Sequence, residues 1–371
     1  MLNKLAINNF KCFINETINF RGLTVLAGAN GVGKSSVIQS LLLIKKFYQS
    51  QFLSDTEAFI SINDKIDSFL ELSSTREIRN SELGESTIVF KVYENDERYD
   101  IITFGIERNN DLSLSGKYEH KQTSSDFPLK NHIHYLNAER LGPRNTQEVT
   151  VQKNLNVGFQ GEYTGQAIAL ASKQIAIVDE SRIEESYLDE KTFESQVQAW
   201  VQFIIPEIEI RIDTFDKINQ VRIGIKKKGS GSDFLHPNNI GFGISYSLPI
   251  IVCCLLATKN SIIIIENPEA HLHPLGQSKM GQFLAKMAGA GLQIIIETHS
   301  EHVINGIRIG SLKKYIEHQD ILINFFTQAR KVNIQEIQIN HKAELDDWPV
   351  GFFDQEERDI SQIFKYTRKP N

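Results

Sequence analysis

The first part of the chain alternates apolar and polar residues, a period typical of half-buried strands. Two strands are predicted within residues 1–20, and three more at 86–93, 99–107 and 112–118. The breaks between these last three are rich in Asn, Asp and Glu, and the Asn and Asp residues favour turns. The pattern predicts an antiparallel meander.

From residue 240 onward, apolar helices alternate with short, continuously apolar runs. Such runs are typical of strands buried on both faces of a parallel sheet. The helices are predicted at 245–257, 275–288 and 301–312, and the strands at 261–265, 292–297, 321–327 and 331–339. This part of the chain is therefore expected to have an α/β organisation.

The middle of the chain gives weaker patterns. Residues 51–80 show no clean period and are predicted to be irregular or helical. Residues 145–205 are predicted to be mainly helical, with 193–205 the clearest helix. A hairpin is predicted from 208–212 and 221–225, and a polar tail follows the final strand.

The strongest chemical signal is a G-x-x-x-x-G-K-S sequence between an apolar run and an apolar helix. Glycines let backbone N–H groups turn toward an anion, the lysine reaches the β- and γ-phosphates, and the serine hydroxyl ligates Mg²⁺. The helix that follows would point its N-terminus at the phosphates. The sequence predicts a bound nucleotide held by Gly28, Asn30, Gly31, Gly33, Lys34, Ser35 and Ser36.

Polar side chains follow two buried strands, at the ends where open α/β sheets bind ligands. Glu266 is the candidate Walker B acid, which would hold Mg²⁺ together with Ser35. His299 is a candidate partner of a γ-phosphate or an attacking water. Each site also has a simpler interpretation. At Glu266, a buried strand would end in a solvated turn. At residues 298–301, Thr298 and Glu301 would form a T-x-x-E capping box, which leaves His299 unexplained.

Two further groups of residues have open interpretations. Gly241, Gly243 and Ser245 open a helix and offer N–H groups and a hydroxyl to an anion, although alone they also fit an ordinary serine N-cap. Arg140 and Arg144 flank a Gly-Pro turn and suit either a phosphate or partner contact or an acidic neighbour within the chain.

Composition narrows the class of protein. A net charge of −6 argues against a general polyanion-binding surface but leaves room for a local basic groove. Three cysteines without a C-x-x-C pair suit reduced thiols, and no apolar stretch is long enough to span a membrane. We therefore expect a cytoplasmic protein with no membrane partner. His271 and His273 have no third ligand near them in the sequence, which argues against zinc.

Several segments resemble one group of ATPases. Residues 4–13 and 23–31 are similar to the opening of RecF, SMC and OLD-family (overcoming lysogenization defect) ATPases. Residues 266–274, Glu-Asn-Pro-Glu-Ala-His-Leu-His-Pro, are similar to the E-x-P-E-A-H-L-H-P run of the OLD-like ABC group. Residues 135–144 and 348–354 also resemble segments of bacterial members.

The resemblance implies an α/β fold: a P-loop NTPase, namely an ABC-type ATPase head with an antiparallel β subdomain and an inserted helical lobe. A single domain is expected, with its core at 1–50 and 240–340, an insertion at 51–239 and a C-terminal segment at 341–371.

The family mechanism implies ATP and Mg²⁺ sandwiched between two copies of the chain, so that the protein is a dimer when ATP is bound. The phosphate loop of one copy would hold the phosphates, and Gly241, Gly243 and Ser245 of the other would contact the γ-phosphate as the signature motif. Residues 270–273 correspond to the D-loop and His299 to the switch histidine.

Two positions depart from that pattern. The usual catalytic glutamate is replaced by Asn267, whose amide is no general base for water. Either Glu269 takes the role, or hydrolysis is slow and acts as a timer. Tyr246 stands where a glutamine is common in the signature.

The function expected from the resemblance is an ATPase that regulates a separately encoded effector nuclease or toxin in anti-phage defence, with nucleic acid as a further partner. Residues 300–371 offer no acidic constellation for the Toprim nuclease domain that OLD nucleases carry there. The alternatives are a stand-alone RecF-like DNA repair or maintenance ATPase, the ATPase subunit of a transporter, and a non-hydrolysing scaffold.

Overall fold

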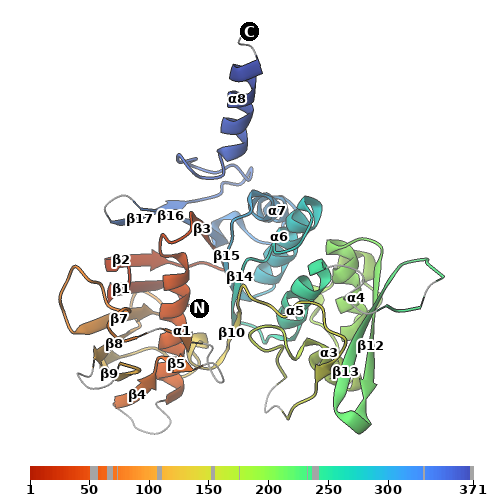
Figure 1. The fold of residues 1–371 in the computed structure, drawn as a ribbon, viewed down its shortest axis with the longest axis horizontal. Helices are drawn as coiled ribbons and strands as arrows, with labels where there is room; N and C mark the ends of the chain where they lie inside the picture. Colours follow the sequence, from red (N-terminus) through yellow and green to blue (C-terminus); the bar gives the residue numbers. More distant parts are fainter. Residues whose placement is uncertain are drawn as a thin grey trace.

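The computed structural model of the protein describes residues 1–50, 57–64, 70–72, 74–106, 111–151, 155–174, 176–231, 233–235, 242–328 and 331–367. Two six-stranded sheets dominate it, one mainly parallel and one antiparallel, with α1 (Lys34–Ser50) packed between them (Figure 1). A lobe of helices and a β-hairpin covers the other side of the parallel sheet. The predicted ABC-type α/β head with a β subdomain and a helical lobe is confirmed.

The parallel sheet, which we call the core sheet, has the strand order β10-β14-β15-β3-β16-β17. Its strands are β3 (Leu23–Gly28), β10 (Ile133–Leu136), β14 (Ile262–Glu266), β15 (Gln293–Glu297), β16 (Ile321–Gln328) and β17 (Val332–Ile337). β17 pairs antiparallel with β16. The register pairs Glu266 with Glu297 and Glu297 with Leu26. The carboxyl ends of β14, β15 and β3 therefore meet at one edge.

The two faces of the core sheet belong to two hydrophobic cores. Ile263 and Ile265 pack with the helical lobe, whereas Ile262 and Ile264 pack with α1 and the antiparallel sheet. All four isoleucines of β14 are fully buried, as expected for a strand covered on both faces. The expected continuous apolar strands are thus explained by helices on both sides of the sheet.

The antiparallel sheet has the order β2-β1-β7-β8-β9-β4 and contains the predicted meander. Its strands are β1 (Lys4–Phe10), β2 (Phe13–Asn19), β4 (Glu57–Ser61), β7 (Thr87–Tyr93), β8 (Tyr99–Ile106) and β9 (Ser113–Lys121), followed by the short helix α2 (Pro128–Asn131). The Phe47 ring of α1 packs edge-on against Phe104 and Tyr118, with centroids 5.5 and 4.9 Å away. These contacts attach the sheet to the nucleotide-loop helix.

The prediction that residues 51–80 are irregular or helical is wrong for much of the described part. Besides β4, the two-residue strands β5 (Asn63–Asp64) and β6 (Leu70–Glu71) lie here. Burial alternates along β4, where Ala58 and Ile60 face inward. A five-residue strand gives too few repeats for its period to stand out in the sequence.

The helical lobe contains fewer helices than the sequence suggests. Its elements are β11 (Gln147–Glu148), α3 (Thr164–Lys173), α4 (Phe193–Ile204), the hairpin β12 (Ile208–Phe215) and β13 (Gln220–Lys227), and α5 (Phe242–Leu256). Between α3 and α4 the described chain forms 3₁₀ turns and irregular segments, so the prediction of a mainly helical 145–205 is wrong. The predicted hairpin is confirmed. Trp200 of α4 is buried, and its ring lies 4.9 Å from that of Phe283.

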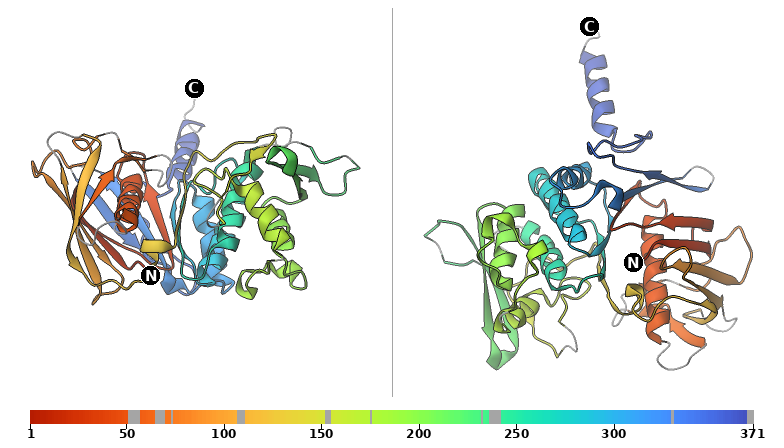
Figure 2. Two further views of the ribbon diagram at one scale, coloured as in Figure 1. Left: turned by 90° about the horizontal axis from the view of Figure 1, so that it is seen from below. Right: turned by 180° about the vertical axis from the view of Figure 1, so that it is seen from behind.

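The C-terminal segment forms a helix instead of the predicted polar tail. α8 (Gln355–Thr367) projects away from the two sheets and the lobe (Figure 2). Before it, Phe352 is fully buried, whereas Trp348 is partly exposed. Ile360, Ile363 and Phe364 of α8 are exposed. Within the described residues, each helix is too short or too polar to cross a membrane.

Helices α6 (Pro274–Gly289) and α7 (Glu301–Leu312) cross at glycines. A Cβ on Gly306 would lie 2.0 Å from the backbone oxygen of Ser278, far inside van der Waals contact. We expect Gly306→Ala to lower the free energy of unfolding by about 2 kcal/mol, because the two backbones must move apart. Urea denaturation measures this change. Gly231→Ala is the control, since a Cβ there meets no atom within 4 Å; equal losses in the two variants would contradict the prediction.

Candidate nucleotide site

The phosphate loop is built from the residues that the sequence indicated. Gly28, Gly31 and Gly33 have φ values of 138°, 78° and 110°, a region that side chains with a Cβ rarely adopt. A Cβ on Gly33 would also lie 2.8 Å from the Cys12 sulfur. α1 begins at Lys34, so its N-terminus faces the loop.

Lys34 is buried and its ammonium group contacts the loop itself. Nζ donates to the carbonyl oxygens of Gly28 at 3.1 Å and Ala29 at 2.6 Å. Burial lowers the pKa of Lys34, and the nearby Glu297 carboxylate, 3.6 Å away, opposes that shift. The lysine is therefore placed inside the loop before any phosphate arrives.

Ser35 contacts Glu297, the last residue of β15. Its hydroxyl lies 2.9 and 3.2 Å from the two carboxylate oxygens and donates to them. Ser35 is exposed, whereas Glu297 is buried. Asn30 and Gly31 are also exposed, and Ser36 donates its backbone N–H to the Gly33 carbonyl at 3.0 Å. Hydroxyl and carboxylate oxygens side by side are ligand types that suit Mg²⁺.

Glu266 ends β14 as expected, but its carboxylate is hydrogen-bonded to residues of β10 and of the segment that follows it. It accepts hydrogen bonds from the Tyr135 hydroxyl and the Ala138 backbone N–H, both at 3.1 Å. Burial and the neighbouring Glu297 carboxylate raise the pKa of Glu266. The structure thus brings Ser35 to Glu297, while Glu266 holds the segment that follows β10.

Arg140 has a structural place inside the chain. Its guanidinium donates to the backbone oxygens of Glu266 at 2.7 Å and Asn267 at 2.6 Å, and to that of Asn137 at 2.9 Å. The residue is 2% exposed, and burial lowers its pKa to about 10. The sequence left two interpretations open for Arg140: a phosphate or partner contact, or a contact within its own chain. The second fits the structure, but the partners are backbone carbonyls and not an acidic side chain. Arg144 is exposed.

Glu269 connects the loops after β14 and β15. Its carboxylate accepts from the Thr298 hydroxyl at 2.7 Å and from the His299 backbone N–H at 2.8 Å. The Thr298–Glu301 capping box does not form, because Thr298 bonds Glu269 and Ser300 caps α7 by accepting from the Val303 N–H. The helix begins two residues later than that alternative required.

Asn267 has a φ of 45°, in the left-handed region where asparagine is favoured over most residues. Its backbone N–H donates to the Glu297 carbonyl at 2.8 Å, which joins the ends of β14 and β15. A turn of this kind explains an asparagine here on conformational grounds, independently of any catalytic role.

His299 is exposed at the same edge and lines a cavity beside the start of the phosphate loop. The wall of this cavity is formed by Gly28, Ala29, His299, Phe325, Gly351, Phe353, Asp354, Gln355 and Arg358. The C-terminal segment thus lies next to the nucleotide loop, a proximity that the sequence pattern did not indicate.

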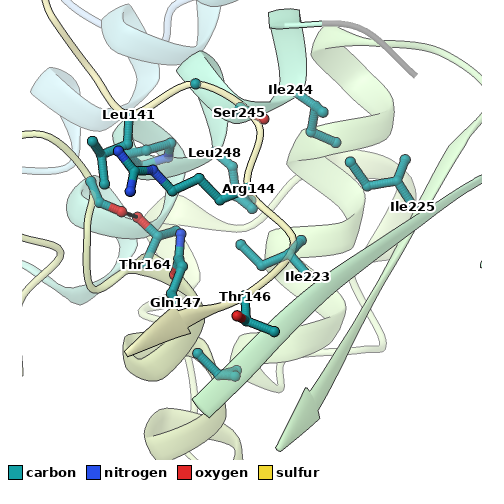
Figure 3. A pocket seen from close by; sticks show the side chains of 14 residues that line it. Leu141, Arg144, Thr146, Gln147, Thr164, Ile223, Ile225, Ile244, Ser245 and Leu248 are labelled. Carbon is teal, nitrogen blue, oxygen red and sulfur yellow. Dashed lines mark hydrogen bonds between the residues drawn. The ribbon is translucent and has the colours of Figure 1, made fainter. Parts of the chain in front are cut away.

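Gly243 and Ser245, which were expected to belong to the signature motif, lie in α5, and this helix packs on the other face of the core sheet. α5 begins at Phe242, so Ser245 is inside its first turn and not at an N-cap. Gly241 lies outside the described residues. A Cβ on Gly243 would lie 2.9 Å from the His271 carbonyl oxygen. Ser245 lines a pocket with Arg144, Gln147 and Thr164, as Figure 3 shows.

His271 and His273, which were expected to lie in a D-loop, belong to no group of three or more possible metal ligands in the part of the chain that the structure describes. The His271 ring lies beside the Tyr246 ring, with centroids 4.4 Å apart and the ring planes tilted by 56°. His273 directly precedes α6, and Pro274 is the first residue of that helix, as predicted.

Sequence reasoning missed Glu297 and Tyr135. Glu297 carried the same signal as Glu266, an acid at the end of a buried isoleucine run. The functional role at this strand end was nevertheless assigned to His299, two residues later. Tyr135 gave no signal, because its contact with Glu266 depends on β10 pairing with β14 across a long stretch of chain.

The strand order, the phosphate loop and the acids at the sheet edge define an ABC-type ATPase head of the SMC and OLD kind. The chain belongs to the family described as "AAA domain, putative AbiEii toxin, Type IV TA system", whose model matches residues 23–305. A second model, "Protein of unknown function (DUF3696)", matches residues 316–363, which include the start of α8.

Two curated proteins are similar to the chain. It is 22% identical over 385 residues to the OLD nuclease of Thermus scotoductus, covering 92% of this chain and 67% of that protein. It is 26% identical over 119 residues to the energy-coupling factor transporter ATP-binding protein EcfA2 of Ureaplasma parvum. The latter match covers 28% of each chain. The protein is thus an AAA/ABC-type ATPase related to OLD nuclease.

Solved structures of SMC heads share the fold. The SmcHead bound to the C-winged helix domain of ScpA has a TM-score of 0.52 at 13% identity and covers 91% of this chain and 98% of that one. A Pyrococcus furiosus Smc head with an extended coiled coil, bound to the C-terminal domain of ScpA, has a TM-score of 0.50 at 12% identity, with 99% of each chain covered.

Proposed function

We propose that the protein binds ATP with Mg²⁺, closes into a dimer around it, and uses slow hydrolysis to time the control of a separately encoded effector. The observation that carries the proposal is the contact of Lys34 and Ser35 with the Glu297 carboxylate at the edge of the core sheet. Ser35 and Glu297 would hold Mg²⁺ there, where the ion would neutralise phosphate charge, and Lys34 would orient the phosphates in the loop.

The placement of the signature residues supports a sandwich of two copies. α1 and α5 pack on opposite faces of the core sheet, because their buried residues belong to different hydrophobic cores. The phosphate loop therefore leads into a helix on one face of the core sheet, whereas Gly243 lies in the first turn of a helix on the other face. A second copy would bring its own Gly243 and Ser245 to the phosphates held by the first.

The contacts of Glu269 support slow turnover. Both of its oxygens accept hydrogen bonds from the loop after β15. A carboxylate held in this way positions the His299 backbone. Positions 267 and 269 were the two considered for the general base. Residue 267 is an asparagine, and both oxygens of Glu269 already accept hydrogen bonds within the chain.

We expect Glu269→Gln to lower Mg²⁺-ATP turnover by about tenfold while ATP affinity changes little, because the variant disturbs His299 and leaves the phosphate loop intact. Asn267→Ala should change turnover less. Steady-state phosphate release and calorimetric ATP titration measure the two quantities. Glu301→Gln is the matched control, since its carboxylate bonds Asn305 within α7. Full turnover in Glu269→Gln would show that this residue plays no part.

The effector proposal is supported by the names of the relatives, a nuclease and a toxin–antitoxin family. Co-expression with each flanking gene, in cells challenged with phage, tests it. Protection or growth arrest that needs both proteins and an intact Lys34 supports the proposal; activity of this chain without any partner would overturn it. ATP turnover is also measured with and without duplex DNA. A stand-alone RecF-like role predicts that DNA stimulates turnover without a partner protein.

A further inference from the structure

The strand between the two expected nucleotide-binding strands carries a buried acid of its own. β15 lies between β3 and β14, and its last residue, Glu297, pairs in register with Leu26 on one side and Glu266 on the other. The Glu297 side chain is 9% exposed. It is therefore the carboxylate at the sheet edge that is nearest to the phosphate loop.

Glu297 and Glu266 contact different residues at this edge of the core sheet. Glu297 accepts from the Ser35 hydroxyl at 2.9 and 3.2 Å and lies 3.6 Å from Lys34 Nζ. Glu266 is instead bonded to Tyr135 and Ala138 on the β10 side. The serine of the phosphate loop thus has its acidic partner on β15.

We propose that Glu297 is the carboxylate that holds the metal ion beside Ser35, and that Glu266 is a positioning residue for the segment after β10. This inference rests on the proposed function, because it names the metal-side acid of that same nucleotide site. It differs from the assignment that the sequence pattern suggested, in which Glu266 shares the ion with Ser35.

The charges at the site give a reason for this assignment. Lys34 Nζ lies 3.6 Å from the Glu297 carboxylate. Phosphates that enter the loop compete for the same ammonium group, and a buried carboxylate that loses its cation is strongly unfavourable. A divalent ion next to Ser35 replaces the lost charge with oxygen ligands already in place. ATP and Mg²⁺ should therefore bind cooperatively through Glu297.

The test measures ATP affinity with Mg²⁺ and with EDTA by calorimetry, in the wild-type protein, Glu297→Gln and Glu266→Gln. Glutamine keeps an acceptor for Ser35 but removes the charge. We expect Glu297→Gln to reduce the Mg²⁺ enhancement of ATP affinity by about tenfold and to leave Mg²⁺-free binding equal or tighter. Glu266→Gln should keep the enhancement.

Two outcomes overturn the inference, and they are distinguishable from failure of the proposed function. An enhancement retained in Glu297→Gln, or lost in Glu266→Gln alone, assigns the ion to Glu266. If the wild-type protein binds no ATP in either buffer, both the proposed function and this inference fail. Ser35→Ala provides a second measurement: combined with Glu297→Gln it should reduce the enhancement less than additively, because both variants remove ligands of one ion.

Discussion

Lys34→Ala is expected to weaken ATP binding by about 100-fold, the largest functional effect that we predict. Nζ now donates to the carbonyls of Gly28 and Ala29, so it already points into the loop. A 100-fold loss corresponds to about 2.7 kcal/mol. A hydrogen bond that involves a charged group contributes roughly 1.5–3 kcal/mol, so the loss of one phosphate contact accounts for it. Calorimetric titration with Mg²⁺-ATP measures it.

Lys46→Ala is the control for this variant, because Lys46 lies on the same helix, in its later part. It should bind ATP within about twofold of the wild-type protein. Thermal denaturation of Lys34→Ala is needed beside the titration, since the substitution leaves the buried Glu297 without its cation. A folded Lys34→Ala protein that binds ATP normally would contradict the nucleotide site.

Arg140→Met is expected to lower the free energy of unfolding by about 3 kcal/mol, because it removes the donors of three backbone carbonyls that lie in or next to the interior. Methionine keeps much of the volume and the apolar stem, so the change reports mainly the lost hydrogen bonds. Urea denaturation measures the loss. ATP turnover should fall as well, since the carbonyls belong to Asn137 and to the strand end that carries Glu266 and Asn267.

Arg144→Met provides the matched control four residues away, where the side chain is exposed. Its stability should stay within about 0.5 kcal/mol of the wild-type protein. Arg140→Lys should recover only part of the loss, because a single ammonium does not reproduce the planar fork that reaches two carbonyls. If the urea midpoint of Arg140→Met equals that of the wild-type protein, the hydrogen bonds of the guanidinium do not stabilise the end of β14.

The elements with long or strongly periodic patterns could be predicted from the sequence. The meander and the strands β14 and β15 were predicted within a few residues, because their burial is regular along the chain. The β12–β13 hairpin was also predicted, because apolar and polar residues alternate in its sequence. Short strands such as β4 and the 3₁₀ turns before α4 were missed, since they contain too few residues to show a period. α8 was missed although Ile360, Ile363 and Phe364 are spaced as on one face of a helix; all three are exposed.

The site shows the same division. The phosphate loop could be recognised because its function requires particular residue types at fixed spacing within eight residues. The partner of Ser35 could not, because it depends on which strand lies next to β3 and on which way each carboxylate turns. Arg140 likewise had two open interpretations until β10 was found beside β14.

The sequence by itself determined the nucleotide loop, the buried strands and the acids at their ends, because these depend on local spacing and on the alternation of apolar and polar residues. The tertiary structure decided which acid meets Ser35, what Arg140 and Glu269 hold, and that the C-terminal segment lies beside the loop. These contacts join residues far apart in the chain, and the order and register of the strands in the core sheet bring them together.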